Sequence, residues 1–216
     1  MTTSPSPRRA STIRAVVIIA AIAVPLVPAG FWLGEVVPMM PAPLQAPELG
    51  LYMLARLFAL TGFVLMFYQF VLTARLPFLE AVLKRPRMIR SHRLVGRIGF
   101  LLMLAHGIIL LAMDPSLYTE KTLGLIALIL LTVAVVAAWF FRPLKLSLKT
   151  WRSIHLLAYL VFPLVFVHAI TLGATVTAYR PVWWLLVVLF GGYCLIVVYR
   201  VARISRSPGP RRDRAR

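Results

Sequence analysis

The residues best suited to do chemistry in this 216-residue sequence are its four histidines. His92 and His106 lie in the segment SHRLVGRIGFLLMLAH, and His155 and His168 lie in the segment IHLLAYLVFPLVFVH. Both segments are otherwise mostly apolar. An ionisable side chain in such a setting is costly, and it usually faces a cofactor or the interior of a helix bundle. The four imidazoles are therefore the candidate functional groups.

Helical spacing predicts how each segment presents its two imidazoles. The fourteen residues from His92 to His106 give a rise of about 21 Å and place both rings within about 40° of the same helix face. The thirteen residues from His155 to His168 give about 20 Å of rise but a mismatch of about 140°. A distortion of the second helix, at Pro163 or at a π-bulge, is needed to turn both rings toward one neighbour. With that distortion the histidines form two pairs at two depths.

This pattern predicts haem ligands. A neutral imidazole is a common axial ligand of haem iron, and helix bundles commonly hold cofactors between facing helices. Two histidines on each iron leave no open coordination position, which favours electron transfer over oxygen chemistry at the metal. We therefore predict two b-type haems, with His92, His106, His155 and His168 as cofactor-binding and metal-binding residues. A zinc site would need ligands that converge on one point, and no serine–histidine–acid set supports hydrolysis.

Other interpretations of the histidines stay open. Each one alone could be an interhelical hydrogen-bond donor, and His92, which lies beside Arg93, could be a solvated interfacial histidine. If only one haem binds, we expect His106 and His168 to hold it. A haem-free membrane protein, such as a small transporter, is a further interpretation.

The composition indicates that lipid surrounds the helices that carry the histidines. Apolar residues make up 61% of the chain and charged residues 14%, which is far from the composition of a soluble domain. A helix needs about 20 mostly apolar residues to cross a bilayer. Six stretches are that long: Ala15–Leu33, Met53–Leu72, Leu94–Met113, Leu123–Phe141, Ile154–Leu172 and Val182–Val201. The predicted fold class is all-α, a polytopic membrane protein whose six-helix transmembrane bundle holds two haems between helices 3 and 5.

The basic residues predict the orientation of these helices. The net charge is +18, but the cations lie at the ends of apolar stretches, which indicates membrane topology and not binding to nucleic acid. With a cytosolic N-terminus, 21 of the 24 Lys and Arg residues fall on the cytosolic side, as the positive-inside rule requires. We expect a multi-pass protein of the cell (inner or plasma) membrane with both termini cytosolic. Its parts are a tail at 1–14, a haem-binding transmembrane domain at 15–203 and a basic tail at 204–216.

The first stretch has a second interpretation as a cleaved signal peptide, because it follows basic residues and contains the small residues Ala29 and Gly30. Its full spanning length favours a retained helix instead. The single cysteine, Cys194, excludes a disulfide within the chain, and we expect it to be a small core residue.

Several arginines lie at the depths where haem propionates would need cations. Arg93, Arg97 and Arg152 cluster at the cytosolic level, and Arg56 lies several residues inside an apolar stretch toward the outer side. We add these four to the candidate cofactor-binding residues, although Arg97 could simply extend its side chain to the lipid headgroups. No Gly-rich nucleotide fingerprint occurs in the sequence, so the electrons must come from outside the chain.

The run HRLVGR from His92 to Arg97, the His92–His106 spacing, and the His155–His168 spacing behind KTWRSIH resemble the ferric reductase-like transmembrane domain family. This family includes ferric reductases, NADPH oxidases and the haem-binding membrane subunit of bacterial methionine sulfoxide reductase systems. The resemblance covers roughly Leu51 to Val201. It implies a six-helix bundle with two stacked haems, in which His92 pairs with His155 and His106 pairs with His168.

The resemblance also implies redox partners. The sequence ends shortly after the sixth stretch, without the flavin and nicotinamide domain of full-length members, so it is similar to the stand-alone form. Electrons would then come from a separate flavoprotein with FAD or FMN, or from membrane quinol, and pass to an extracytoplasmic acceptor such as a partner protein. This implies an oxidoreductase component for electron transport. The alternative is a haem b membrane subunit that anchors a partner oxidoreductase, such as a methionine sulfoxide reductase or a quinol-linked dehydrogenase.

Overall fold

The computed structural model describes residues 7–205, and the regular secondary structure in this part of the chain is all helical, with no β-strand. Six of its helical segments are long and apolar enough to cross a membrane: Ser11–Met39, Pro47–Thr73, Arg85–Met113, Thr119–Trp139, Leu148–Leu172 and Arg180–Ser205. The predicted fold class, an all-α multi-pass membrane protein, is confirmed.

The individual helices divide into long spanning elements and short connecting ones. The long ones are α1 (Pro7–Val36), α3 (Pro47–Thr73), α5 (Arg85–Met113), α6 (Thr119–Trp139) and α10 (Arg180–Ser205). The fifth span consists of two elements, α7 (Leu148–His155) and α8 (Ala158–Leu172). Short connections are η1 (Val37–Met39), α2 (Ala42–Gln45), α4 (Pro77–Val82) and α9 (Ala174–Ala178).

Proline and serine mark where several of these helices begin. Prolines lie in the first turn of α3, α4 and α5, where a missing backbone N–H costs nothing because that N–H would have no partner within the helix. In α7 the side chain of Ser147 caps the helix by accepting a hydrogen bond from the backbone N–H of Thr150 at 3.0 Å. With a proline in its first turn, α5 begins at Arg85, well ahead of the apolar stretch predicted from Leu94.

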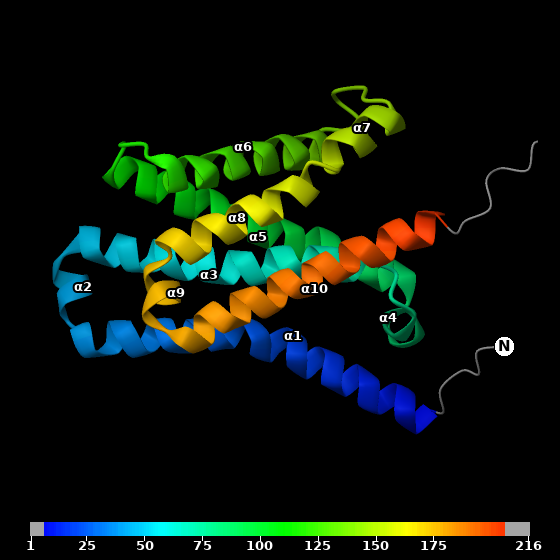
Figure 1. Ribbon diagram of the computed structural model, residues 1–216, viewed down its shortest axis with the longest axis horizontal. Helices are drawn as coiled ribbons and strands as arrows, with labels where there is room; N and C mark the ends of the chain where they lie inside the picture. The colour runs from blue at the N-terminus through cyan, green and yellow to red at the C-terminus, as the bar shows by residue number, and fades with distance from the viewer. Residues whose placement is uncertain (1–6, 206–216) are drawn as a thin grey trace, which may run out of the picture.

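The long helices run side by side and place the short elements at two ends (Figure 1). We call one the α2 end, where α2 and α9 lie. The other is the basic end, where α4, α7 and the last turns of α10 lie (Figure 1); it carries Arg85, Arg93, Arg97, Lys149, Arg152 and Arg203. The first and last described residues, 7 and 205, both lie at the basic end.

Residues 1–6 and most of the predicted basic tail lie outside the described residues. Residues 7–14, which were predicted as part of the N-terminal tail, belong to α1.

Glycines allow α3 and α5 to approach each other closely. A Cβ atom at Gly99 would lie 3.3 Å from Leu65 Cβ, and a Cβ atom at Gly62 would lie 3.0 Å from the side chain of Met103. Such close packing holds helices together in lipid, where burial of apolar surface supplies little driving force. Both α3 and α6 pack against α5 and also against α8, so α3 and α6 flank the two helices that carry His106 and His168.

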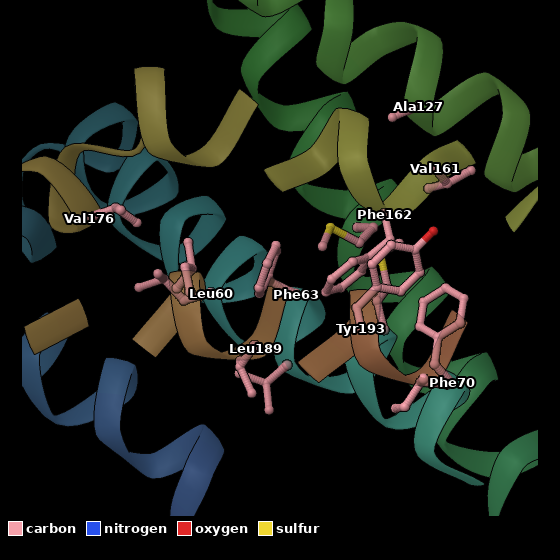
Figure 2. Close-up of a cluster of buried hydrophobic side chains, with 14 of the residues drawn as sticks. Leu60, Phe63, Phe70, Ala127, Val161, Phe162, Val176, Leu189 and Tyr193 are labelled. Carbon is pink, nitrogen blue, oxygen red and sulfur yellow. The ribbon is translucent and has the colours of Figure 1, made fainter. Parts of the chain in front are cut away.

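The aromatic core lies between α3, α8 and α10 (Figure 2). Phe162 is fully buried, with its ring centre 4.9 Å from those of Phe63 and Tyr193. The Tyr193 hydroxyl donates to the backbone carbonyl of Tyr159 at 2.6 Å. This carbonyl lies four residues before Pro163, which has no N–H to give it, so α10 supplies the missing donor. Cys194, in contrast, is exposed on α10, and the prediction that it is a core residue was wrong.

Candidate functional site

The structure brings the four histidines together in two pairs. His106 of α5 faces His168 of α8 with the ring centres 6.3 Å apart. His92 of α5 faces His155 of α7 with the ring centres 6.2 Å apart. Because α5 is one continuous helix, the two pairs are separated by about 21 Å along its axis. The first pair lies toward the α2 end and the second toward the basic end.

A tight turn between α7 and α8 rotates the second helix. The backbone N–H groups of Leu157, Tyr159 and Leu160 donate to carbonyls three residues earlier, at 3.0, 3.0 and 2.9 Å. Such bonds wind the chain more tightly than an α-helix, so they add rotation between His155 and His168 and offset part of the mismatch expected for an ideal helix. The distortion therefore lies at Leu156–Leu157, ahead of Pro163, which remains inside α8.

Backbone carbonyls hold both imidazoles at the α2 end. His106 Nδ1–H donates to the carbonyl of Ala55 in α3 at 3.0 Å, and His168 Nδ1–H donates to the carbonyl of Glu120 in α6 at 2.8 Å. A carbonyl oxygen can only accept, so the proton of each neutral ring lies on Nδ1 and the lone pair lies on Nε2. Metal-bound histidines in proteins are held in this way.

The absence of a side chain at Gly124 lets the His168 ring pack directly against α6. A Cβ atom at position 124 would lie 2.7 Å from both Cε1 and Nδ1 of His168, which is closer than real Cβ atoms come to a neighbour. The ring therefore lies directly on the turn of α6 that also supplies the carbonyl of Glu120. Only a glycine at position 124 leaves room for it.

The pair at the α2 end opens into a cavity of about 460 Å³. This volume is within the range of about 300–1,000 Å³ that is usual for cofactor and ligand sites. The walls come from α3, α5, α6, α8, α9 and α10 and are mostly apolar, with Phe63, Met66, Met103, Leu128, Val165 and Leu186 among the lining residues. The polar groups on the wall include His106, His168, Arg56 and Lys121.

Arg56 lines this cavity, and a nearby carboxylate compensates its charge. Its guanidinium forms an ion pair with Glu35 of α1 and donates a hydrogen bond of 2.5 Å to Thr175 Oγ1 of α9. Its side chain is only 12% exposed, and among the described residues its Nε has no hydrogen-bond partner. One N–H of a buried cation is therefore free for a further acceptor.

Lys121 is the second cation on the cavity wall. Its ammonium donates to the backbone carbonyl of Asp114 and lies 3.0 Å from Asp114 Oδ2. The Ser116 hydroxyl and backbone N–H both donate to Asp114 Oδ1, at 2.6 and 3.0 Å. Hydrogen bonds from Ser116, together with the one from Lys121, lower the pKa of Asp114 to about 2. The carboxylate that anchors the loop between α5 and α6 therefore stays ionised to a lower pH than an ordinary aspartate.

The pair at the basic end is held differently. The Nδ1 atoms of His92 and His155 are buried and have no hydrogen-bond partner among the described residues. The ring of His155 instead stacks on the indole of Trp151, with the ring centres 5.4 Å apart and the planes 16° from parallel.

The three arginines predicted for this level are exposed, and a half-buried arginine lies at the same end of the bundle. Arg93, Arg97 and Arg152 all have exposed side chains. Arg200 of α10 is half-buried, with its guanidinium 5.6 Å from the ring centre of Tyr159 and donating to Thr73 Oγ1 at 3.4 Å. No sequence pattern singled out Arg200, Lys121 or Gly124, because each belongs to a helix other than the histidine helices and its facing direction depends on packing.

Each pair supplies two imidazoles, which suits a metal whose other ligands come from a cofactor and not from the protein. Among the described residues no three His, Cys, Asp or Glu side chains lie close enough together to hold a metal ion, whereas a protein-only zinc site needs three or four. Two imidazoles that face each other with ring centres 6.2 and 6.3 Å apart could together bind the iron of one haem at each level. The residues therefore fit haem.

The chain matches one known protein family. The model of the ferric reductase like transmembrane component matches residues 58–166, which are 109 of the 216 residues. This range contains His92, His106 and His155 and ends two residues before His168. Comparisons with curated proteins and with solved structures gave no match. The chain, a multi-pass membrane protein, belongs to the ferric reductase-like transmembrane family, and this membership indicates transmembrane electron transfer.

Proposed function

We propose that the protein carries electrons across the membrane through two b-type haems, one held by each histidine pair. The observation that carries the proposal is the geometry of the pairs, whose ring centres lie 6.2 and 6.3 Å apart at two levels of one bundle. When bound, a haem held by the two imidazoles of a pair would supply a one-electron carrier.

At the α2 end, the chain's own residues orient the ligands and compensate charge. The carbonyls of Ala55 and Glu120 keep the proton on Nδ1 of His106 and His168, which leaves Nε2 of both rings available to iron. Arg56 and Lys121 lie on the same cavity wall and would meet the propionate carboxylates. The apolar lining excludes water, which strengthens these charge interactions.

At the basic end, His92 and His155 are the proposed ligands, and Arg200, which contacts Tyr159 and Thr73, is a half-buried cation at this level. Arg93, Arg97 and Arg152 add positive charge at the surface there. Between the two levels, the core around Phe162 keeps water out of the bundle. The histidine side chains are thus the proposed ligands of the two electron carriers, and the arginines would stabilise the bound cofactor.

The proposed direction follows from the charge at the two ends. Since basic residues mark the cytosolic side of a membrane protein, the basic end faces the cytosol and both termini are cytosolic. A flavoprotein with FAD or FMN, or membrane quinol, would reduce the basic-end haem. The α2-end haem would then pass electrons to an extracytoplasmic acceptor, as ferric reductases do.

Haem content tests the proposal. Protein expressed with an adequate haem supply and purified in detergent should give close to two b-type haems per chain in a pyridine haemochrome assay, because each pair supplies two ligands. A value near one would restrict the proposal to His106 and His168, whose rings are fixed by hydrogen bonds. Folded protein without any haem would overturn it.

A further inference from the structure

The two histidine pairs differ in what fixes their rings. At the α2 end each imidazole is held by a hydrogen bond from Nδ1 to a backbone carbonyl. At the basic end neither Nδ1 has a partner among the residues that the structure describes. A ring without such a bond can rotate about its Cβ–Cγ bond unless packing prevents it. For His155, some other contact must therefore set the plane of the ring.

Trp151 provides that contact for His155. The two residues are four apart in α7, so their side chains lie on the same face of this helix. The indole and imidazole planes are within 16° of parallel, with ring centres 5.4 Å apart. The indole also contacts Phe141, whose ring meets it edge-on with the ring centres 6.1 Å apart. The indole is thus held between the segment after α6 and the imidazole of His155.

The start of α7 fixes this arrangement. Ser147 caps the helix through its hydrogen bond with the N–H of Thr150, and its hydroxyl also lies 2.8 Å from Thr150 Oγ1. The helix ends at His155, directly before the tight turn at Leu156–Leu157. Because α7 is short, capped at its start and followed by a turn, Trp151 and His155 keep a fixed orientation relative to each other.

We infer that Trp151 is the positioning residue of the basic-end haem site: its indole sets the plane of the His155 imidazole in place of a hydrogen bond. This inference rests on the proposed function, in which His155 is a haem ligand. The two sites then differ in how their ligands are oriented. Both α2-end ligands are fixed by backbone carbonyls, whereas His155 at the basic end is fixed by a side chain that can be substituted.

The test compares Trp151→Leu with Trp151→Phe in the purified, haem-loaded protein. Electron paramagnetic resonance of the ferric form reports each low-spin haem separately, and its signal depends on the orientation of the two imidazole planes. In Trp151→Leu the signal of the basic-end haem should broaden or disappear, and the haem content should fall toward one per chain. The α2-end signal should not change. Trp151→Phe, which keeps an aromatic face, should restore the wild-type spectrum.

Trp139→Leu is the matched control. This indole lies at the same end of the bundle, in the last turn of α6, but it is 46% exposed and makes an edge contact with Phe100 instead of stacking on a histidine. Its loss should leave both signals unchanged. If Trp151→Leu binds two haems with both signals as in wild type, or if folded Trp151→Phe behaves like Trp151→Leu, the inference is wrong while the proposed function stands. Absence of haem from the wild type would instead remove the proposed function.

Discussion

Replacing either histidine of a pair with alanine is expected to remove the same haem. His106→Ala and His168→Ala should each abolish the α2-end haem, and His92→Ala and His155→Ala should each abolish the basic-end haem. The reason is the separation of the two pairs, which is about 21 Å along α5. No imidazole can cross that distance to replace a lost ligand, and a haem with one axial ligand is held weakly.

Redox titration of each variant measures this directly. The wild type should show two midpoint potentials, and each variant should show one, with the same potential missing within a pair. Cys194→Ala is a suitable control, since Cys194 is exposed on α10, and it should retain both. Loss of different potentials from His106→Ala and His168→Ala, with the fold intact, would show that these two residues do not share a haem.

Gly124→Ala is expected to disrupt the α2-end haem almost as strongly as loss of the ligand itself. The added Cβ would lie 2.7 Å from Cε1 and Nδ1 of His168, so the ring must move away from α6. That movement breaks its hydrogen bond of 2.8 Å to the carbonyl of Glu120 and displaces the imidazole from its position facing His106. One methyl group should therefore lower the haem content from two toward one per chain.

Gly191→Ala is the matched control for this substitution. Gly191 also lies inside a spanning helix, but no atom lies within 4 Å of a Cβ built at this position. Its haem content and both potentials should equal those of the wild type. If Gly124→Ala retains two haems with unchanged potentials, then His168 does not ligate haem from the position seen in the structure.

The fold could be predicted from the sequence because length and apolar composition alone identify membrane spans. All six predicted stretches lie within the six observed spans or within two residues of their ends. The helix ends were less predictable, since they depend on local features such as the prolines in the first turns of α3 and α5 and the serine cap of α7. The interruption of the helix at Leu156–Leu157 was also not predicted, because leucine is a residue type that favours helices.

The candidate site was predictable only where it depends on spacing along one helix. The two histidine pairs follow from the periodicity of α5 and from one distortion in the facing helix. The groups that hold those rings did not follow, because a backbone carbonyl such as that of Ala55 or Glu120 carries no sequence signal. Arg56 was identified by its place in an apolar stretch, but its pairing with Glu35 depends on how α1 packs on α3.

Electron transfer across a sealed bilayer is the most direct measurement of the central proposal. Haem-loaded protein is reconstituted in vesicles that contain ferricyanide, and a reductant that does not cross lipid is added outside. The entrapped ferricyanide should be reduced rapidly with wild-type protein, because the two pairs together span the bundle. The His92→Ala/His106→Ala double variant, which removes one ligand from each level, should reduce it no faster than vesicles without protein. If wild-type protein that holds two haems is equally slow, the chain does not carry electrons across the membrane.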